Sequence, residues 1–458
     1  MAGLVTTPSR GVLDPRRRLF RHPAQVVVAA FAVAVAVGTV LLMLPVSRAG
    51  DGGAPFTVAL FTSTSAVCVT GLTVVDTAGY WSGFGEAVVL LLIQVGGLGI
   101  MTLASLLVVL VSRRMGLRSR LTTATETRSV GIGDFRSVLT GVLRVTVLFE
   151  AVTAVALGLR FALGYDEPAG RAAYLGVFHA VSAFNNAGFA LWSDSLMRYA
   201  EDPWVCLPIA GAVIFGGLGF PVLLELRRSL WAPRDWSLHT RLTVSATAAL
   251  LLGGTVFVTA TEWANPATLG SMDSPGRVLA GFFHSVMPRT AGFNTLDMAA
   301  VEDSTLLGTA ALMFIGGGSA GTAGGIKVTT FVVLLLVIVA EVRGDPDVNA
   351  FDRRIGERVQ RQALTVALLG IALVVGGTLV VSELTTLPLS DVFFEVTSAF
   401  ATVGLSTGIT ADLPVAAHLV LTLVMFVGRL GPITFASALA LRDRQRLHRL
   451  PEGRPIIG

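Results

Sequence analysis

The amino-acid sequence predicts an all-α polytopic membrane protein made of four tandem units, each with a helix, a short re-entrant helix, a loop and a second helix. Composition is the first observation: apolar residues make up 53% of the 458 residues and charged residues only 14%, against about 25% charged in ordinary soluble domains. The other two are a pattern that recurs four times and arginines that cluster in short segments between apolar runs. The chain therefore belongs in a bilayer, and its net charge of +4 is better explained by membrane topology than by nucleic-acid binding.

The recurring pattern is a short run of small and polar residues that ends in a glycine. Three copies match in length, at residues 65–72 (SAVCVTGL), 182–189 (SAFNNAGF) and 398–405 (SAFATVGL), and residues 285–293 (SVMPRTAGF) repeat the pattern with a shift of one. The glycines are Gly71, Gly188, Gly292 and Gly404, which are 117, 104 and 112 residues apart. A period of roughly a hundred residues indicates one structural unit used four times.

The apolar runs divide the chain into these units and their connections. We predict a cytoplasmic N-terminus (1–23), unit 1 (24–111), a cytoplasmic linker (112–136), unit 2 (137–230), unit 3 (239–340), a second cytoplasmic linker (341–357), unit 4 (358–441) and a cytoplasmic C-terminus (442–458). Two crossings per unit return the chain to its starting side, which gives eight spans in four parallel repeats. Arginines mark the cytoplasmic ends, and the acidic residues of the outer segments would concentrate cations at the mouth.

The recurring loops are the candidate functional segments. Non-helical backbone at membrane depth is tolerated only where it is buried in protein or lines a water-filled path. Four such loops around one central pore could present carbonyl oxygens that replace the hydration shell of a monovalent cation, with glycine supplying the backbone angles this needs. The alternative is that the glycines serve only close helix packing. The residues expected to form the filter are Val69, Thr70, Gly71, Leu72, Asn186, Ala187, Gly188, Phe189, Thr290, Ala291, Gly292, Phe293, Thr402, Val403, Gly404 and Leu405.

A glycine-rich stretch interrupts the second span of unit 3, directly before the only lysine of the sequence. A phosphate-binding loop is disfavoured because no strand precedes it, which leaves a passive kink or a mobile gate below the filter. Arg429, inside an apolar run, is expected to contact carbonyls or hydroxyls of residues 319–322, as part of the gate or as a brace between helices. The predicted gate residues are Gly316, Gly317, Gly318, Ser319, Ala320, Gly321, Thr322, Ala323, Gly324, Gly325, Lys327 and Arg429. In unit 2 we expect an internal ion pair between Arg144 and Glu150.

These motifs resemble the Trk/Ktr/HKT superfamily of potassium transporters, and within it the eight-span Ktr-type membrane subunit. The most specific are residues 288–294 (PRTAGFN), 316–327 (GGGSAGTAGGIK) and 427–432 (VGRLGP). The resemblance implies four pseudo-equivalent units around one pore, and potassium held by the filter backbone at Gly71, Gly188, Gly292 and Gly404. It also implies an intramembrane gate at 316–325 that is contacted by Arg429.

The same resemblance implies a homodimer in the cytoplasmic (inner) membrane of a bacterium, seated on a ring of separate cytosolic subunits that bind nucleotide and open the gate. Potassium is the expected transported ion, sodium is a candidate activator, and no cofactor is expected within the chain. An enzyme is disfavoured because no His, Asp, Ser or Cys cluster stands out at midplane depth. A secondary transporter coupled to sodium or protons is the alternative; a titratable acid near the filter would favour it, and the filter loops contain none.

Overall fold

The computed structural model describes residues 23–114 and 135–431, and this part of the chain is mostly helical. Its only sheet is an antiparallel hairpin of β1 (Asn349–Ala350) and β2 (Arg353–Arg354). The predicted all-α class is therefore confirmed. The predicted N-terminal segment, most of the linker 112–136, the end of unit 4 and the C-terminal segment lie outside the described residues.

Each unit has a long first helix, a short second helix and a further long segment whose helix, called the third helix here, is α4, α8, α12 or α16. Unit 1 contains α1 (Pro23–Met43), α2 (Phe56–Val67), α3 (Thr77–Tyr80) and α4 (Gly83–Arg114), and unit 2 contains α6 (Phe135–Gly164), α7 (Ala169–Phe184), α8 (Pro203–Leu218) and α9 (Phe220–Ser229). Unit 3 contains α10 (Leu238–Glu262), α11 (Ser274–Val286), α12 (Asp303–Ile315) and α13 (Val328–Arg343), and unit 4 contains α14 (Glu357–Leu384), α15 (Leu389–Ala401) and α16 (Val415–Leu430). Short 3-10 turns are η2 (Pro45–Ser47), η3 (Met197–Tyr199), η4 (Pro233–Asp235), η5 (Leu269–Ser271) and η6 (Ile409–Asp412).

The short helices begin at clear sequence signals. Pro55, Pro168 and Pro388 directly precede α2, α7 and α15, where a missing N–H and a fixed φ suit a helix start. Asp273 caps α11 by accepting a hydrogen bond from the amide of Gly276 (2.6 Å). These helices have 12, 16, 13 and 13 residues, fewer than the roughly 20 needed to cross a bilayer. Each can enter the membrane but not span it.

Span length separates the first helix of each unit from the third. Within the described residues, four helices are long and apolar enough to cross a membrane, and they belong to α1, α6, α10 and α14. The third helices vary: α4 is continuous over 32 residues, whereas α16 has only 16. In unit 2, α8 and α9 form a pair bent by 103° at Gly219, and in unit 3, α12 ends at Ile315 before α13 begins at Val328. The count of eight crossings therefore stays a prediction.

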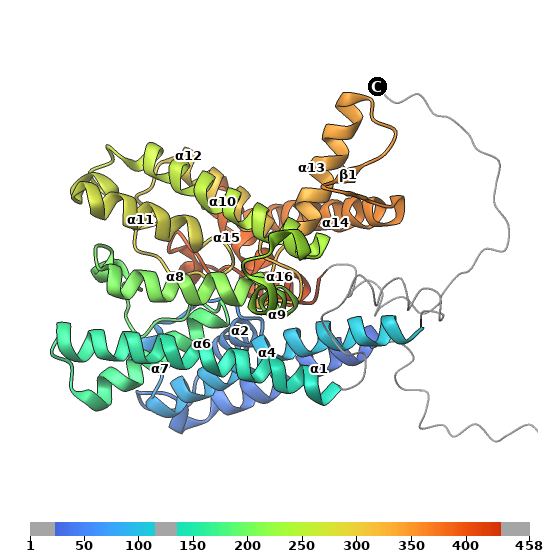
Figure 1. Cartoon of the computed structure of the whole chain (residues 1–458). Helices are drawn as coiled ribbons and strands as arrows, with labels where there is room; N and C mark the ends of the chain where they lie inside the picture. The colour runs from blue at the N-terminus through green and yellow to red at the C-terminus, as the bar shows by residue number, and fades with distance from the viewer. Residues whose placement is uncertain (1–22, 115–134, 432–458) are drawn as a thin grey trace, which may run out of the picture.

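The units pack in a ring in chain order. The third helix of each unit contacts the short helix of the next, in the pairs α4 with α7, α8 with α11 and α12 with α15, and α16 closes the ring against α2. Figure 1 shows units 1 and 2, in blue to green, on one side of the molecule and α10 to α12, in yellow-green, on the other. This arrangement brings the C-terminal ends of all four short helices, and the loops that follow them, to a common centre.

Candidate functional site

The four loops share an unusual backbone conformation. In each, a non-glycine residue with positive φ is followed two residues later by a glycine with positive φ: Val69 (55°) and Gly71 (95°), Asn186 (59°) and Gly188 (69°), Thr290 (72°) and Gly292 (73°), Thr402 (51°) and Gly404 (92°). Positive φ is uncommon for side-chain-bearing residues and costs about 1–3 kcal/mol, so the surroundings must impose it. The sequence predicted unusual backbone angles at the four glycines but not at the residues two positions earlier. Val, Asn and Thr share no property that favours a positive φ.

Serines of the short helices hold three of the loops. The Oγ atoms of Ser65 and Ser398 accept hydrogen bonds from the amides of Gly71 and Gly404 (both 3.0 Å), and Ser182 Oγ donates to the carbonyl of Phe189 (2.8 Å). The third loop, whose motif has the one-residue shift, is held differently. Ser285 Oγ donates to the Leu251 carbonyl of α10 (2.8 Å), and the amide of Gly292 donates to Met287 instead.

The four glycines form a closed ring. A Cβ atom added at Gly188 would lie 2.6 Å from the carbonyl oxygen of Ala291, in the next unit. Cβ atoms at the other three would clash in the same sense, Gly71 with Ala187 O, Gly292 with Val403 O and Gly404 with Thr70 O. Every loop thus abuts the carbonyl that precedes the glycine of the next loop. The ring has no room for a side chain, and it brings all four predicted glycines together.

The other predicted loop residues divide into two groups. Thr70, Ala187, Ala291 and Val403 supply the carbonyls of the ring. The residues that follow the glycines, Leu72, Phe189, Phe293 and Leu405, have side chains that are at most 1% exposed. Because these side chains are packed inside the protein, they anchor the loops and leave the backbone as the polar surface at the centre.

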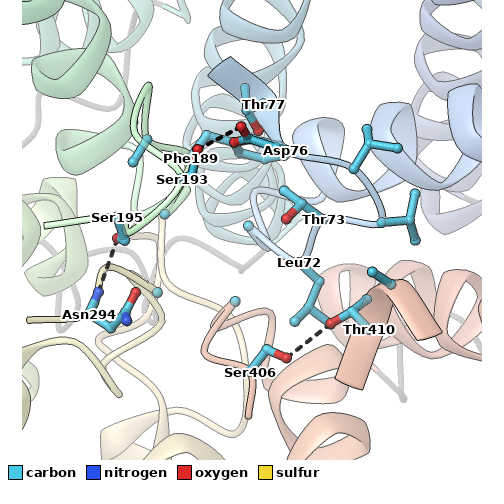
Figure 2. Close-up of a pocket in the computed structure, with 18 of the residues that line it drawn as sticks. Leu72, Thr73, Asp76, Thr77, Phe189, Ser193, Ser195, Asn294, Ser406 and Thr410 are labelled. Carbon is cyan, nitrogen blue, oxygen red and sulfur yellow. Dashed lines mark hydrogen bonds between the residues drawn. The ribbon is translucent and has the colours of Figure 1, made fainter. Parts of the chain in front are cut away.

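Above the ring lies a cavity of about 310 Å³ lined by all four glycines. Hydroxyl, amide and carboxylate groups make up much of the wall, and Figure 2 shows Thr73, Asp76, Ser193, Asn294, Ser406 and Thr410 around it. Hydrogen bonds join the units across the cavity, from Ser193 Oγ to Asp76 Oδ2 (2.7 Å) and from the Asn294 amide to Ser195 Oγ (3.3 Å). Such a polar cavity suits water and hydrated cations. Sequence reasoning did not assign these side chains to the site, although the spacing was a usable signal: Thr73, Asn294 and Ser406 each lie two residues after a loop glycine.

The glycine-rich stretch 316–325 lies against the other side of the same loops. Thr322 Oγ1 donates to Asn186 Oδ1 (2.9 Å), and the Gly324 amide donates to Thr290 Oγ1 (3.2 Å). A third contact runs from the Gly318 amide to the Gly217 carbonyl of α8 (2.8 Å). The stretch therefore docks on the positive-φ residues of units 2 and 3 and on the bend between α8 and α9.

Three basic side chains bind carbonyls of this stretch. Arg429, 5% exposed, donates through Nη1 to Thr322 O, the contact expected from the sequence. Lys327 Nζ donates to Ala323 O (2.6 Å). Arg289, 4% exposed, donates through Nη1 to Gly316 O (3.3 Å); the sequence did not single it out, although an arginine beside a membrane loop is itself a signal. The stretch is thus held by cations from units 3 and 4.

The expected ion pair of unit 2 was wrong. The carboxylate of Glu150 accepts a hydrogen bond from Asn185 Nδ2 (3.0 Å), which also donates to Gln94 Oε1 (2.9 Å). Arg144, on the other hand, is exposed. Asn185 directly follows α7, so it can turn towards α4 and α6 and offer an amide to the acid, whereas residues six apart on one helix point in different directions.

Replacing Thr322 by Val tests how firmly the stretch is docked. The variant keeps the shape but leaves Asn186 Oδ1 without this buried donor, which should lower the free energy of unfolding by about 1–3 kcal/mol. We expect a lower midpoint of thermal unfolding of the purified protein in detergent. Thr365→Val is the matched control, because the exposed Thr365 bonds only the Arg361 carbonyl of its own helix (2.8 Å). Equal midpoints for the two variants would contradict the docking contact.

Comparisons with known proteins agree with this geometry. The TrkH family model, described as a cation transport protein, matches residues 14–445. Ktr system potassium uptake protein B of Bacillus subtilis is 38% identical over 95% of this chain and 97% of its own length, and the protein of the same name from Vibrio alginolyticus is 38% identical over 92% of this chain and 91% of its own.

Among solved structures, the potassium transporter TrkH from Vibrio parahaemolyticus has a similar fold. Its TM-score is 0.73 at 18% sequence identity, and the match covers 93% of this chain and 87% of that one. The relatives are transport proteins, which confirms the expectation of a transporter over an enzyme. This chain belongs to the TrkH family of cation transport proteins.

Proposed function

We propose that this chain is the pore subunit of a potassium uptake system. The closed ring of Gly71, Gly188, Gly292 and Gly404 carries the proposal, because each loop meets a carbonyl of the next and none leaves room for a side chain. Rings of backbone carbonyls at membrane depth replace the hydration shell of potassium. Two relatives identical at 38% are named as potassium uptake proteins. The membrane potential, about 2.3 kcal/mol per charge per 100 mV, would drive entry without ATP hydrolysis by the chain.

The stretch 316–325, with Lys327 and Arg429, is the proposed gate. Its position directly below the loops supports this role. Its composition does so too, since a glycine-rich segment can be rearranged at low cost in side-chain contacts. Its hydrogen bonds to Asn186 and Thr290 would hold it across the path. Opening would break these hydrogen bonds and the one from Arg429 to the Thr322 carbonyl, and new contacts would replace them.

The proposed partners are supported by the relatives named as potassium uptake proteins of Ktr systems. The pore subunit would form a homodimer in the bacterial cytoplasmic membrane, with both termini in the cytoplasm, and a ring of nucleotide-binding subunits would act on the gate. The arginine-rich turn between α13 and α14 supports this orientation, because Arg343, Arg353, Arg354 and Arg358 are all exposed there.

Uptake in cells tests this function. A bacterial strain without its own potassium uptake systems, expressing the chain together with a nucleotide-binding subunit of the Ktr type, should grow at low external potassium and take up potassium faster than sodium. Collapsing the membrane potential should stop the uptake. A chain that reaches the membrane but supports neither growth nor potassium uptake would contradict the proposal.

A coupled transporter is the second candidate, and one observation favours it. Glu395, a buried acid of α15, lies behind the fourth loop, although no acid lies within the loops themselves. Potassium flux driven by potential alone, without sodium and without a pH gradient, would separate an uncoupled pore from obligate coupling.

A further inference from the structure

Glu395 stands apart from the other buried acids of the described chain. Three acidic residues there are at most 7% exposed: Asp202, Glu262 and Glu395. Asp202 forms an ion pair with Arg160 (2.8 Å) and accepts from Tyr165 Oη (2.8 Å). Glu262 uses both oxygens, accepting from the Glu302 amide on Oε1 and from Thr268 and Asn265 on Oε2. Both acids are therefore accounted for by the fold alone.

The carboxylate of Glu395 has hydrogen-bond acceptor capacity that no donor in the described part of the chain fills. The side chain is 0% exposed. Oε1 accepts a hydrogen bond from Thr410 Oγ1, whereas Oε2 has no hydrogen-bond partner in the described part of the chain. No arginine or lysine is paired with it among the described ion pairs. A buried acid that meets only the neutral hydroxyls of Thr410 and Ser406 is costly for folding alone, so a cation that enters its field would offset this cost.

Glu395 is joined to the ring and to the cavity above it. On α15 it lies three residues before Ser398, whose Oγ holds the Gly404 amide at 3.0 Å, and residues at this spacing share a helix face. Its partner Thr410 lines the cavity and is bonded to Ser406, another lining residue, at 3.1 Å. Ser406 also lies beside the Glu395 carboxylate. Figure 2 shows the Ser406 and Thr410 hydroxyls facing each other at the wall.

We propose that Glu395 supplies the negative charge that makes the outer end of the ring, beside Ser406 and Thr410, a binding site for a monovalent cation. This inference rests on the proposed potassium pore. The ring itself is built from neutral backbone, and the buried side chains that contact the stretch 316–325 on the opposite side, such as Arg289 at Gly316 O, are basic. A unit charge about 10 Å away, at an effective dielectric constant of about 20, changes cation affinity on the order of tenfold.

Potassium binding can be measured without opening the gate. A ligand at concentration L that binds only the folded state stabilises it by RT ln(1 + L/Kd), so the unfolding midpoint begins to rise when the ligand concentration passes Kd. The midpoint of the full-length protein in detergent is therefore followed as potassium replaces choline at constant ionic strength. In Glu395→Gln the potassium concentration at which the midpoint begins to rise should be about tenfold higher. Glu395→Asp, which keeps the charge, should stay within about twofold of the parent protein. If the Gln variant does not fold, Glu395→Met is a second neutral replacement of similar volume.

Glu262→Gln is the matched control. It should lower the midpoint at every potassium concentration, because donors that now face both oxygens would meet an amide N–H₂, yet leave the potassium dependence unchanged. A parent protein without any potassium-dependent shift would count against the pore itself. A parent protein that responds to potassium, with neutral Glu395 variants responding at the same concentrations, would overturn only the role of Glu395.

Discussion

Gly71→Ser is expected to reduce the preference of the pore for potassium over sodium by about tenfold, since strain of about 1–3 kcal/mol at a positive-φ site is comparable to the 1.4 kcal/mol of a tenfold change. The Cβ atom would lie 2.5 Å from Ala187 O and 3.2 Å from Gly188 Cα, so the loops of units 1 and 2 must separate. Carbonyls moved apart no longer replace the hydration shell of potassium as a set. The flux ratio of the two ions, measured under one imposed potential, checks the result.

Gly408→Ser separates the two causes of that effect. Gly408 has the same φ as Gly71, 95°, and lines the same cavity, but nothing lies within 4 Å of a Cβ atom placed there. If contact between the loops sets the preference, Gly408→Ser keeps the parent flux ratio. An unchanged ratio in folded Gly71→Ser protein would refute the assignment of the ring as a selectivity filter.

Deleting residues 317–324 is expected to raise basal potassium flux on the order of tenfold or more. The deletion removes the hydrogen bonds from Thr322 to Asn186 and from Gly324 to Thr290, and the carbonyl that Arg429 binds. At about 1 kcal/mol each, these contacts exceed the 1.4 kcal/mol that corresponds to a tenfold shift between closed and open states. Potassium flux of the purified chain, without any partner, is the measurement.

A deletion of the same length in the hairpin region between α13 and α14 is the control. Residues 347–354 include the hairpin β1–β2 and its ion pairs, Arg354 with Asp347 (2.9 Å) and Arg241 with Asp352 (3.0 Å). Their removal should leave basal flux unchanged. Folded protein that lacks 317–324 and shows no gain in flux would favour a passive kink over a gate.

The fold was predictable where a local signal repeats. Apolar runs of spanning length indicated α1, α6, α10 and α14, and the four loop glycines indicated one unit used four times. The closed order of the ring could not be read from the chain. It arises from packing between segments about a hundred residues apart, such as Gly404 against Thr70 O, and no local pattern encodes which loop meets which.

Within the site, the sequence predicted backbone roles better than side-chain partners. Glycines indicate unusual backbone angles, and a lone arginine in an apolar run, such as Arg429, indicates a buried hydrogen-bond partner. Glu395 gave no comparable signal. From the sequence alone, an acid in a short amphipathic helix is expected to face solvent, and only the packing shows that it is buried. Glu150 was assigned to Arg144 on proximity in sequence, whereas its donor, Asn185, comes from another helix.

Cation flux into proteoliposomes containing only this chain tests the central claim most directly. The parent protein and the deletion of residues 317–324 would be compared with potassium and sodium in turn, under the same imposed potential. A pore complete in one polypeptide predicts potassium flux well above sodium flux in the deletion variant, and little flux in the parent while the gate stays shut. A folded deletion variant that conducts neither ion, or conducts both equally, would contradict the four-loop potassium pore.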